Sequence, residues 1–282
     1  MGYKIAFLFL TINNPNFTKV WDYYFKDHQD KINIYIHPKY PENITWHSEN
    51  IIKNLKPTAW GYIVDAYKQL FKTAIKNKEN IKFITISESC LPIKPFNILY
   101  DFAMKNKKES FIKLNIMKKY DYEFRLPPNI KQIIGEKNLI KHYARMCLSR
   151  FHIKELLRNE SKLDLFIKMH VGDEFFLSSI TPLTHFKNIA ITFDDWDYIN
   201  KEVNNLNKKI KQLYQEQERD NKINNNEKII KLQNIKKDIA KNPKNIIIVS
   251  SDDIYNIEHC DSYFYRKFDK NSDIEKYIYK YI

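Results

Sequence analysis

Polar side chains follow three apolar runs of the sequence, each with the length and β-branched content of a buried strand. The runs end with these residues: Thr11 and Asn13, His37, and Ser87, Glu88 and Ser89. Hydroxyl, amide, imidazole and carboxylate groups of this kind can bind a sugar nucleotide. Ser, Thr and Asn at strand ends more often cap helices or turns. The set therefore leaves a structural and a binding interpretation open.

Two pairs of carboxylates could serve in proton transfer or metal binding. Asp173 and Glu174 stand at the expected start of a helix, where the helix dipole also favours acidic side chains. Asp195 and Asp197 form an Asp-x-Asp pattern, and carboxylates at this spacing can hold a divalent cation. Taken alone, the first pair is expected to stabilise its helix, and the second is a candidate metal site.

Several well-known catalytic motifs are absent. No His-Glu-x-x-His or Gly-x-Ser-x-Gly pattern occurs, which excludes the corresponding metalloproteases and hydrolases. The four glycines are too dispersed for a dinucleotide fingerprint or a Walker loop. Cys90, Cys147 and Cys260 are far apart and odd in number, which argues against a disulfide framework and a Cys-x-x-Cys metal site. The cysteines indicate a reducing compartment.

The elements that must position these side chains alternate between strand and helix. Apolar runs at 4–12 and 32–37 flank the amphipathic stretch 17–25, and helical spacing after Trp60-Gly61 leads into the run 81–86. Two such βαβ units predict an α/β fold with a mostly parallel sheet, and ligands beyond the carboxyl ends of its strands. Further elements are predicted as follows: helices at 96–105, 150–168 and 172–180, and strands at 110–116, 143–149, 189–193 and 245–249.

Residues 200–241 differ in composition from the rest of the chain, because Asn, Lys, Gln and Glu dominate them. Apolar residues at spacings of three and four predict an antiparallel helical hairpin that turns near 224–226. We expect this hairpin to be an insertion in a single domain of residues 1–282. Its apolar stripe could close on itself or hold a partner, and the first alternative is favoured.

The 282 residues carry a formal charge of +13, from 47 Lys and Arg against 34 Asp and Glu. This surplus suits nucleotides, nucleic acid or lipid. The lysines are spread along the chain in a composition typical of A/T-rich genomes, which favours an enzyme over the alternative of a basic nucleic-acid-binding protein. No apolar run is long enough to span a membrane and the first lacks signal-peptide features, so we expect a soluble, cytoplasmic protein.

The segment Lys82–Phe96, with Trp60-Gly61 before it, resembles the core-2/I-branching β-1,6-N-acetylglucosaminyltransferase family and its peptide O-xylosyltransferase relatives. Nearly the whole chain outside 200–241 shares the likeness, in the order of the family. The other matching segments are the opening strand with Asn14-Pro15, the strand with IYIH, Cys147–Arg150, Asp173-Glu174, Phe193–Tyr198 and Tyr265–Asp269. The composition suits a giant-virus or bacterial member.

The resemblance implies a GT-A-like, Rossmann-like fold and an inverting transfer that needs no metal. UDP-N-acetylglucosamine is the expected donor, UDP-xylose is the close alternative, and a glycan or protein-linked group is the acceptor. Glu174 matches the family's general base, while Lys267 and Lys244 match basic residues that stabilise the leaving diphosphate.

The remaining site residues are also implied by the resemblance. Those on the nucleotide side are Thr11, His37 and Arg266, and those on the acceptor side are Glu88, Trp196 and Tyr198. Lys39 departs from the family, because an acidic residue often follows its His-containing strand. Metal-dependent GT-A enzymes carry Asp-x-Asp after the strand that matches Phe83–Ile86, whereas Asp195 and Asp197 follow Glu174. Their position argues against a metal site, and no cofactor is expected.

Overall fold

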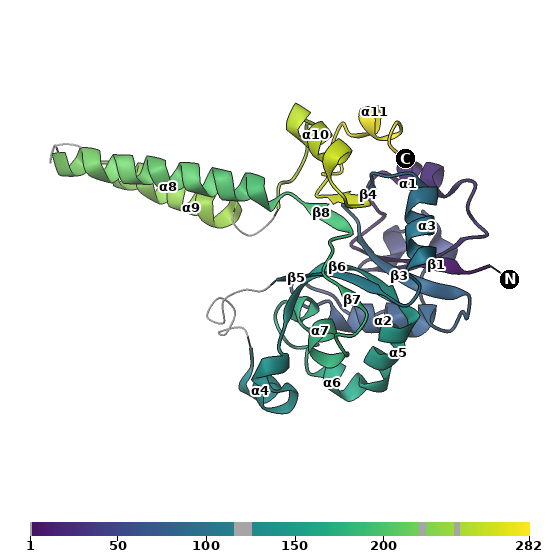
Figure 1. The fold of residues 1–282 in the computed structure, drawn as a ribbon. Helices are drawn as coiled ribbons and strands as arrows, with labels where there is room; N and C mark the ends of the chain where they lie inside the picture. The colour runs from purple at the N-terminus through teal and green to yellow at the C-terminus, as the bar shows by residue number, and fades with distance from the viewer. Residues whose placement is uncertain (1, 116–125, 220–223, 240–242) are drawn as a thin grey trace.

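A computed structural model describes residues 2–115, 126–219, 224–239 and 243–282 of the chain. Its centre is a six-stranded sheet in the order β2-β1-β3-β6-β5-β7 (Figure 1). The strands are β1 (Lys4–Thr11), β2 (Ile32–Pro38), β3 (Asn80–Ser87), β5 (Ser110–Asn115), β6 (Lys141–Ser149) and β7 (Phe186–Lys187). Within this sheet, β6 is antiparallel to both neighbours and the other pairings are parallel. The predicted α/β fold with a mostly parallel sheet is confirmed.

Both faces of the sheet are buried, as continuous apolar runs predict. In β1, Phe7 and Phe9 pack on one side with α1 and α3, whereas Ala6 and Leu8 pack on the other side with α2, α5 and α7. The first face is covered by α1 (Thr18–Phe25) and α3 (Phe96–Lys105). The second face is covered by α2 (Val64–Ala74), α5 (Arg150–Arg158), α6 (Glu160–Asp164) and α7 (Phe176–Ile180), with α4 (Pro128–Ile134) beside them.

A second, three-stranded sheet carries the end of the chain back to the central one. It contains β4 (Leu91–Pro92), β9 (Phe264–Arg266) and β8 (Thr192–Asp194), in that order. Leu91 pairs with Tyr265, and the Phe268 amide donates to the Ser89 carbonyl at 3.1 Å. This pairing places Arg266 and Lys267 beside the residues that follow β3. Two helices flank this region, α10 (Ser251–His259) and α11 (Glu275–Ile278).

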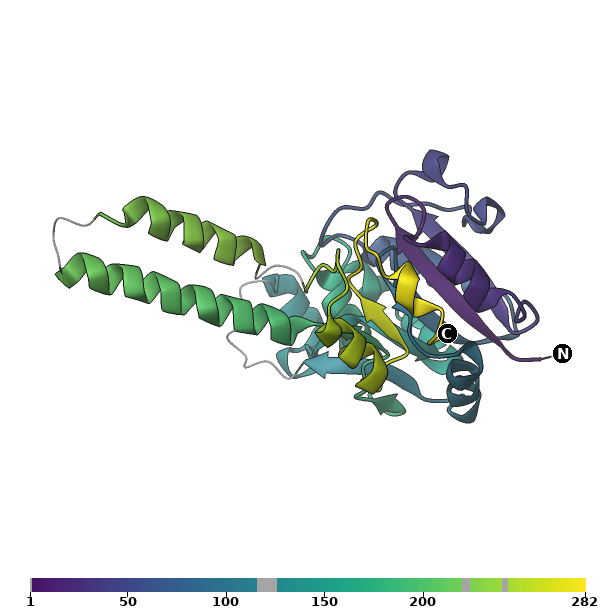
Figure 2. The same ribbon diagram turned by 90° about the horizontal axis from the view of Figure 1, so that it is seen from above.

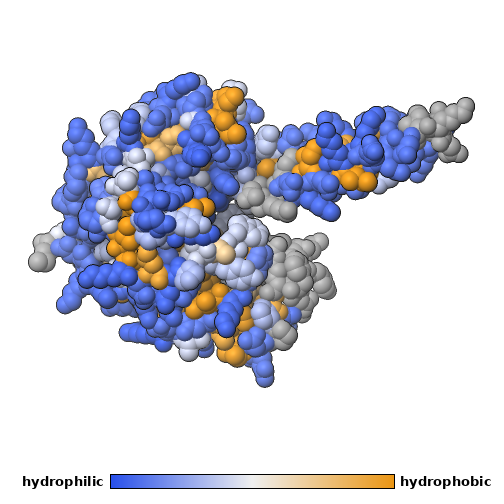
Figure 3. Space-filling model, turned by 180° about the vertical axis from the view of Figure 1, so that it is seen from behind, coloured by the Kyte–Doolittle hydropathy of each residue, from blue (hydrophilic) through white to orange (hydrophobic). Residues whose placement is uncertain are grey.

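The predicted hairpin is present as α8 (Trp196–Arg219) and α9 (Asn226–Ile239), which project from the body of the protein (Figures 1 and 2). The two helices pack against each other, and Leu206 in the first and Ile229 in the second are buried. Other apolar side chains remain visible between charged ones on the hairpin surface (Figure 3). The first helix begins at Trp196, four residues before the predicted insertion, so Trp196 and Tyr198 belong to its first turn.

The predicted strand at 245–249 is wrong. Only Ile246 forms a β-bridge, with Phe268, and Ile247 and Ile248 are 53% and 78% exposed. The Val249 amide donates to the Asp273 side chain at 2.8 Å, and the next residue caps α10, so the backbone leaves the extended path after a single bridge. An apolar run predicts a strand only where a second strand is available to pair along its length.

Other predicted elements are present with different bounds. The helix predicted at 150–168 ends and restarts at Asn159, whose side chain donates to the Glu155 carbonyl at 2.9 Å. The helix predicted from residue 172 begins as a 3₁₀ turn, Gly172–Glu174, before α7. The strand predicted at 189–193 is β8, at Thr192–Asp194. No helix in the described part of the chain is long and apolar enough to cross a membrane.

Candidate active site

The ends of β1 and β2 lie side by side, because Thr11 pairs with Pro38, the residue after His37. The His37 Nε2 atom accepts a hydrogen bond from the Lys56 amide at 3.0 Å, and burial lowers the pKa of the imidazole. A neutral His37 therefore fixes the neighbouring loop. The Thr11 hydroxyl and His37 Nδ1 are buried and have no hydrogen-bond partner among the described residues.

The Ser-Glu-Ser-Cys segment after β3 joins this edge of the sheet. Glu88 accepts a hydrogen bond from the Ile12 amide at 2.8 Å through one carboxylate oxygen, and its carbonyl accepts one from the Asn16 amide at 2.8 Å. The Ser87 hydroxyl lies 3.0 Å from Cys90 Sγ. Glu88, predicted on the acceptor side, therefore ties together the segments that follow β1 and β3.

Close backbone packing sets the turn that carries Asp173 and Glu174. The Val171 amide donates to the Gly61 carbonyl at 2.7 Å, and Gly61 has a positive φ of 78°. A Cβ atom on Gly61 would lie 2.6 Å from the His170 ring, and one on Gly172 would lie 2.3 Å from the Phe166 carbonyl oxygen. The Trp60-Gly61 motif thus supports the carboxylate turn from a distant segment.

The two carboxylates of the turn have different environments. Asp173 is buried, and this burial together with the adjacent Glu174 raises its pKa to about 6, although Arg145 and Arg266 act in the opposite direction. The Glu174 side chain is 29% exposed, and its Oε2 atom lies 3.1 Å from Lys141 Nζ. Glu174 is therefore the carboxylate of the turn that a molecule from solution can reach.

A cluster of cations lies next to the carboxylate turn. Arg266 donates from Nη1 to Asp194 at 2.9 Å, while its buried Nε has no partner within the described structure. Burial lowers the pKa of Lys267, as do the positive charges of Arg266 and Arg145. The Lys267 ammonium forms no hydrogen bond or ion pair with the residues that the structure describes. Carboxylates and cationic side chains thus share one region of the protein.

Sequence reasoning did not identify Arg145 as a site residue. It lies in β6 between Ala144 and Met146, whose backbones both hydrogen-bond the Thr85 hydroxyl. The Arg145 guanidinium donates to the Tyr67 hydroxyl at 3.2 Å. A charged residue within the apolar strand 143–149 was the signal that could have identified it.

Lys244 occupies a different environment from Lys267, although their backbones are hydrogen-bonded at 3.4 Å. The Lys244 ammonium lies 2.7 Å from the fully buried carboxylate of Asp253 and 4.9 Å from the centre of the Tyr198 ring. Asp253 also forms the capping box of α10 with Ser250. Lys244 is therefore at the edge of the site with a carboxylate partner already in place.

The Asp-x-Asp segment has a structural role at one of its positions. Asp195 is buried, and its carboxylate accepts a hydrogen bond from the Tyr198 amide at 2.9 Å, which caps the start of α8. The side chain of Asp197 lies outside the described part of the structure. Within the described side chains, no group of three or more His, Cys, Asp or Glu residues could hold a metal ion. Trp196 is partly buried and Tyr198 is 41% exposed.

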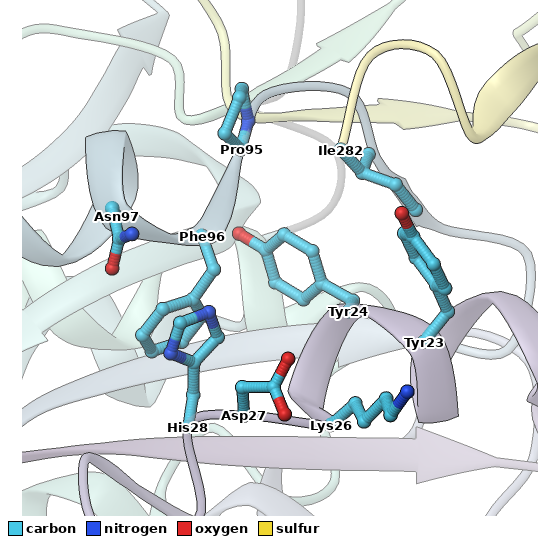
Figure 4. Close-up of a pocket in the computed structure, with 9 residues that line it drawn as sticks. All are labelled: Tyr23, Tyr24, Lys26, Asp27, His28, Pro95, Phe96, Asn97 and Ile282. Atoms are coloured by element: carbon cyan, nitrogen blue, oxygen red, sulfur yellow. The ribbon is translucent and has the colours of Figure 1, made fainter.

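A pocket on another part of the molecule lies between the end of α1 and the start of α3 (Figure 4). Tyr24, Asp27, His28 and Phe96 line it, and the His28 ring stacks on Phe96 at 4.1 Å between centroids. The end of α1 precedes β2, so this pocket lies near the amino end of that strand. It contains none of the predicted site residues.

The family model described as "Core-2/I-Branching enzyme" matches residues 5–213. The chain belongs to the core-2/I-branching enzyme family. The resemblance inferred from the motifs is thereby confirmed. The part of this chain that matches the family model includes Glu174 and ends within α8. Lys244, Arg266 and Lys267 lie beyond it.

A curated relative is similar over part of its length. "Glycosyltransferase BC10" from Oryza sativa subsp. japonica is 26% identical over 175 residues, which cover 58% of this chain and 43% of the rice protein. The chain thus spans less than half the length of this relative.

Proposed function

We propose that this protein is an inverting, metal-independent glycosyltransferase that transfers a sugar from a UDP-sugar to a glycan or protein-linked acceptor. N-acetylglucosamine is the proposed sugar, and xylose is the alternative. Family membership supports transfer chemistry. The observation that carries the proposal is the electrostatic interaction of Asp173, the neighbour of Glu174, with Arg145 and Arg266, which come from separate strands.

In the proposed reaction, Glu174 takes the proton of the acceptor hydroxyl while the acceptor oxygen attacks the anomeric carbon. The bond from that carbon to the diphosphate oxygen breaks on the opposite side, and its electron pair leaves with the UDP. Lys267 and Arg266 stabilise the negative charge of the departing diphosphate. Lys141, whose Nζ atom lies 3.1 Å from Glu174 Oε2, is placed to orient the Glu174 carboxylate.

The other predicted site residues fit around this centre. Thr11 and the neutral His37 are proposed for the nucleotide, since both lie at the carboxyl edge of parallel strands. Glu88, Trp196 and Tyr198 are proposed for the acceptor, because the exposed ring of Tyr198 can stack on a sugar and the partly buried Trp196 lies in the same helical turn. Lys244 holds this region together through Asp253 and contributes positive charge from the edge of the site.

The test is a panel of UDP-sugars, each assayed for hydrolysis and for thermal protection, with EDTA and with added Mn²⁺. We expect one UDP-sugar to protect the protein and to be hydrolysed equally well in EDTA. Activity that disappears in EDTA and returns with Mn²⁺ would favour the alternative in which Asp195 and Asp197 hold a cation. DNA binding without protection by any UDP-sugar would favour a nucleic-acid-binding protein instead.

A further inference from the structure

Arginine is scarce in this chain, with six arginines among the 47 basic residues. Two of them have ordinary structural surroundings. Arg150 donates to the backbone carbonyls of Ile75, Asn77 and Asn80 at 2.6–2.9 Å, which saturates much of its guanidinium. Arg158 is exposed and pairs with Glu155 within its own helix. These residues show how arginine is used here for stability alone.

Arg145 has different surroundings. The Tyr67 hydroxyl, which accepts a hydrogen bond from the Arg145 guanidinium, is an uncharged partner, and the Arg145 Nε atom is buried without a partner in the described structure. Arg266 has the same unpartnered Nε atom. Buried donors without acceptors cost free energy, so two of them in one cluster indicate that an acceptor is supplied by a ligand.

The fold places Arg145 beside the proposed donor site. Its neighbours in β6 are bonded to Thr85, two residues before the Ser-Glu-Ser segment that ends β3. The Ser89 carbonyl accepts the Phe268 amide, which holds Lys267 against the same segment. Arg145 and Lys267 also repel each other electrostatically. Two neighbouring positive charges favour the binding of a multivalent anion between them.

Tyr67 keeps Arg145 in this position. The ring is 1% exposed in α2 and stacks on Phe71, and burial raises the pKa of its hydroxyl, so the group remains neutral. A neutral hydroxyl orients the guanidinium without cancelling its charge, unlike a carboxylate. The planar fork of arginine can bind two phosphate oxygens at once.

We propose that Arg145, oriented by Tyr67, is a third cationic ligand of the donor diphosphate, in addition to Arg266 and Lys267. This inference rests on the proposed function, because it assigns a further residue to the same donor site. It explains why an arginine stands in an apolar strand and why its Nε lacks a protein acceptor.

The test is calorimetric titration of the full chain with inorganic pyrophosphate at constant ionic strength. Arg145→Met is expected to weaken pyrophosphate binding by about tenfold to a hundredfold, the effect of one charge-assisted contact. Arg145→Lys is expected to retain part of the affinity, and Tyr67→Phe is expected to weaken binding severalfold. Arg158→Met, the matched control on an exposed arginine, is expected to bind like the wild type.

The outcomes separate this inference from the proposed function. Normal pyrophosphate affinity in Arg145→Met, together with loss in Lys267→Ala, would overturn the role of Arg145 and leave the donor site intact. Absence of binding to the wild type would overturn both. If Arg145→Met does not fold, unchanged affinity in both Arg145→Lys and Tyr67→Phe would overturn the inference, and weaker binding in both would support it.

Discussion

Asp173→Asn is expected to stabilise the protein at neutral pH and to have no such effect in acid. The Asp173 carboxyl has a pKa of about 6 in the folded protein, against 3.8 as its ordinary value, chiefly because it is buried. The folded protein therefore retains this proton at pH values where the unfolded chain has released it. Stability from this group is greatest below pH 3.8 and falls as the pH rises towards 6. Above pH 6, the free energy of unfolding is lower by about 3 kcal/mol than it would be if Asp173 kept its proton in both states.

The measurement is urea denaturation of wild type and Asp173→Asn at several pH values between 4 and 8. An amide resembles the protonated carboxyl, so the gain in unfolding free energy should grow from about 0.5 kcal/mol at pH 4 to about 3 kcal/mol at pH 8. Asp101→Asn, on the exposed surface of α3, is the control and should show no such growth. An equal effect of Asp173→Asn at both ends of the range would refute the burial argument.

Three further substitutions test the site. Glu174→Gln is expected to lower transfer turnover by about a hundredfold or more with UDP affinity retained, because an amide cannot accept the proton; near-normal turnover would remove Glu174 from the mechanism. Lys267→Ala is expected to weaken the binding of UDP by about 1.5–3 kcal/mol in calorimetric titration, and Lys267→Arg should keep part of the affinity. An unchanged affinity in the alanine variant would contradict the assignment. Gly172→Ala would place a Cβ 2.3 Å from the Phe166 carbonyl oxygen, so the denaturation midpoint and turnover should fall together. Gly2→Ala, whose Cβ would meet nothing within 4 Å, is its control, and equal behaviour of the two variants would show that the turn tolerates the change.

Local sequence patterns determined the sheet and the hairpin. A continuous apolar run such as β1 can only be buried on both faces, which requires helices on both sides. Spacings of three and four in the hairpin define a helix with one apolar side, and two such helices cover each other. The carboxylate turn was also visible, because Gly172 and the acidic residues after it are adjacent in sequence.

Tertiary structure alone decided which charges meet. The pairing of Leu91 with Tyr265 joins segments far apart in the chain and places Lys267 beside the end of β3, whereas Arg145 arrives there through the antiparallel strand β6. The buried carboxylate of Asp253 likewise takes Lys244 as its partner. Such contacts depend on strand pairing over long separations, and the charge of a side chain acts on whatever the fold brings near it. The spacing of residues along one segment does not determine how close that segment lies to a distant one.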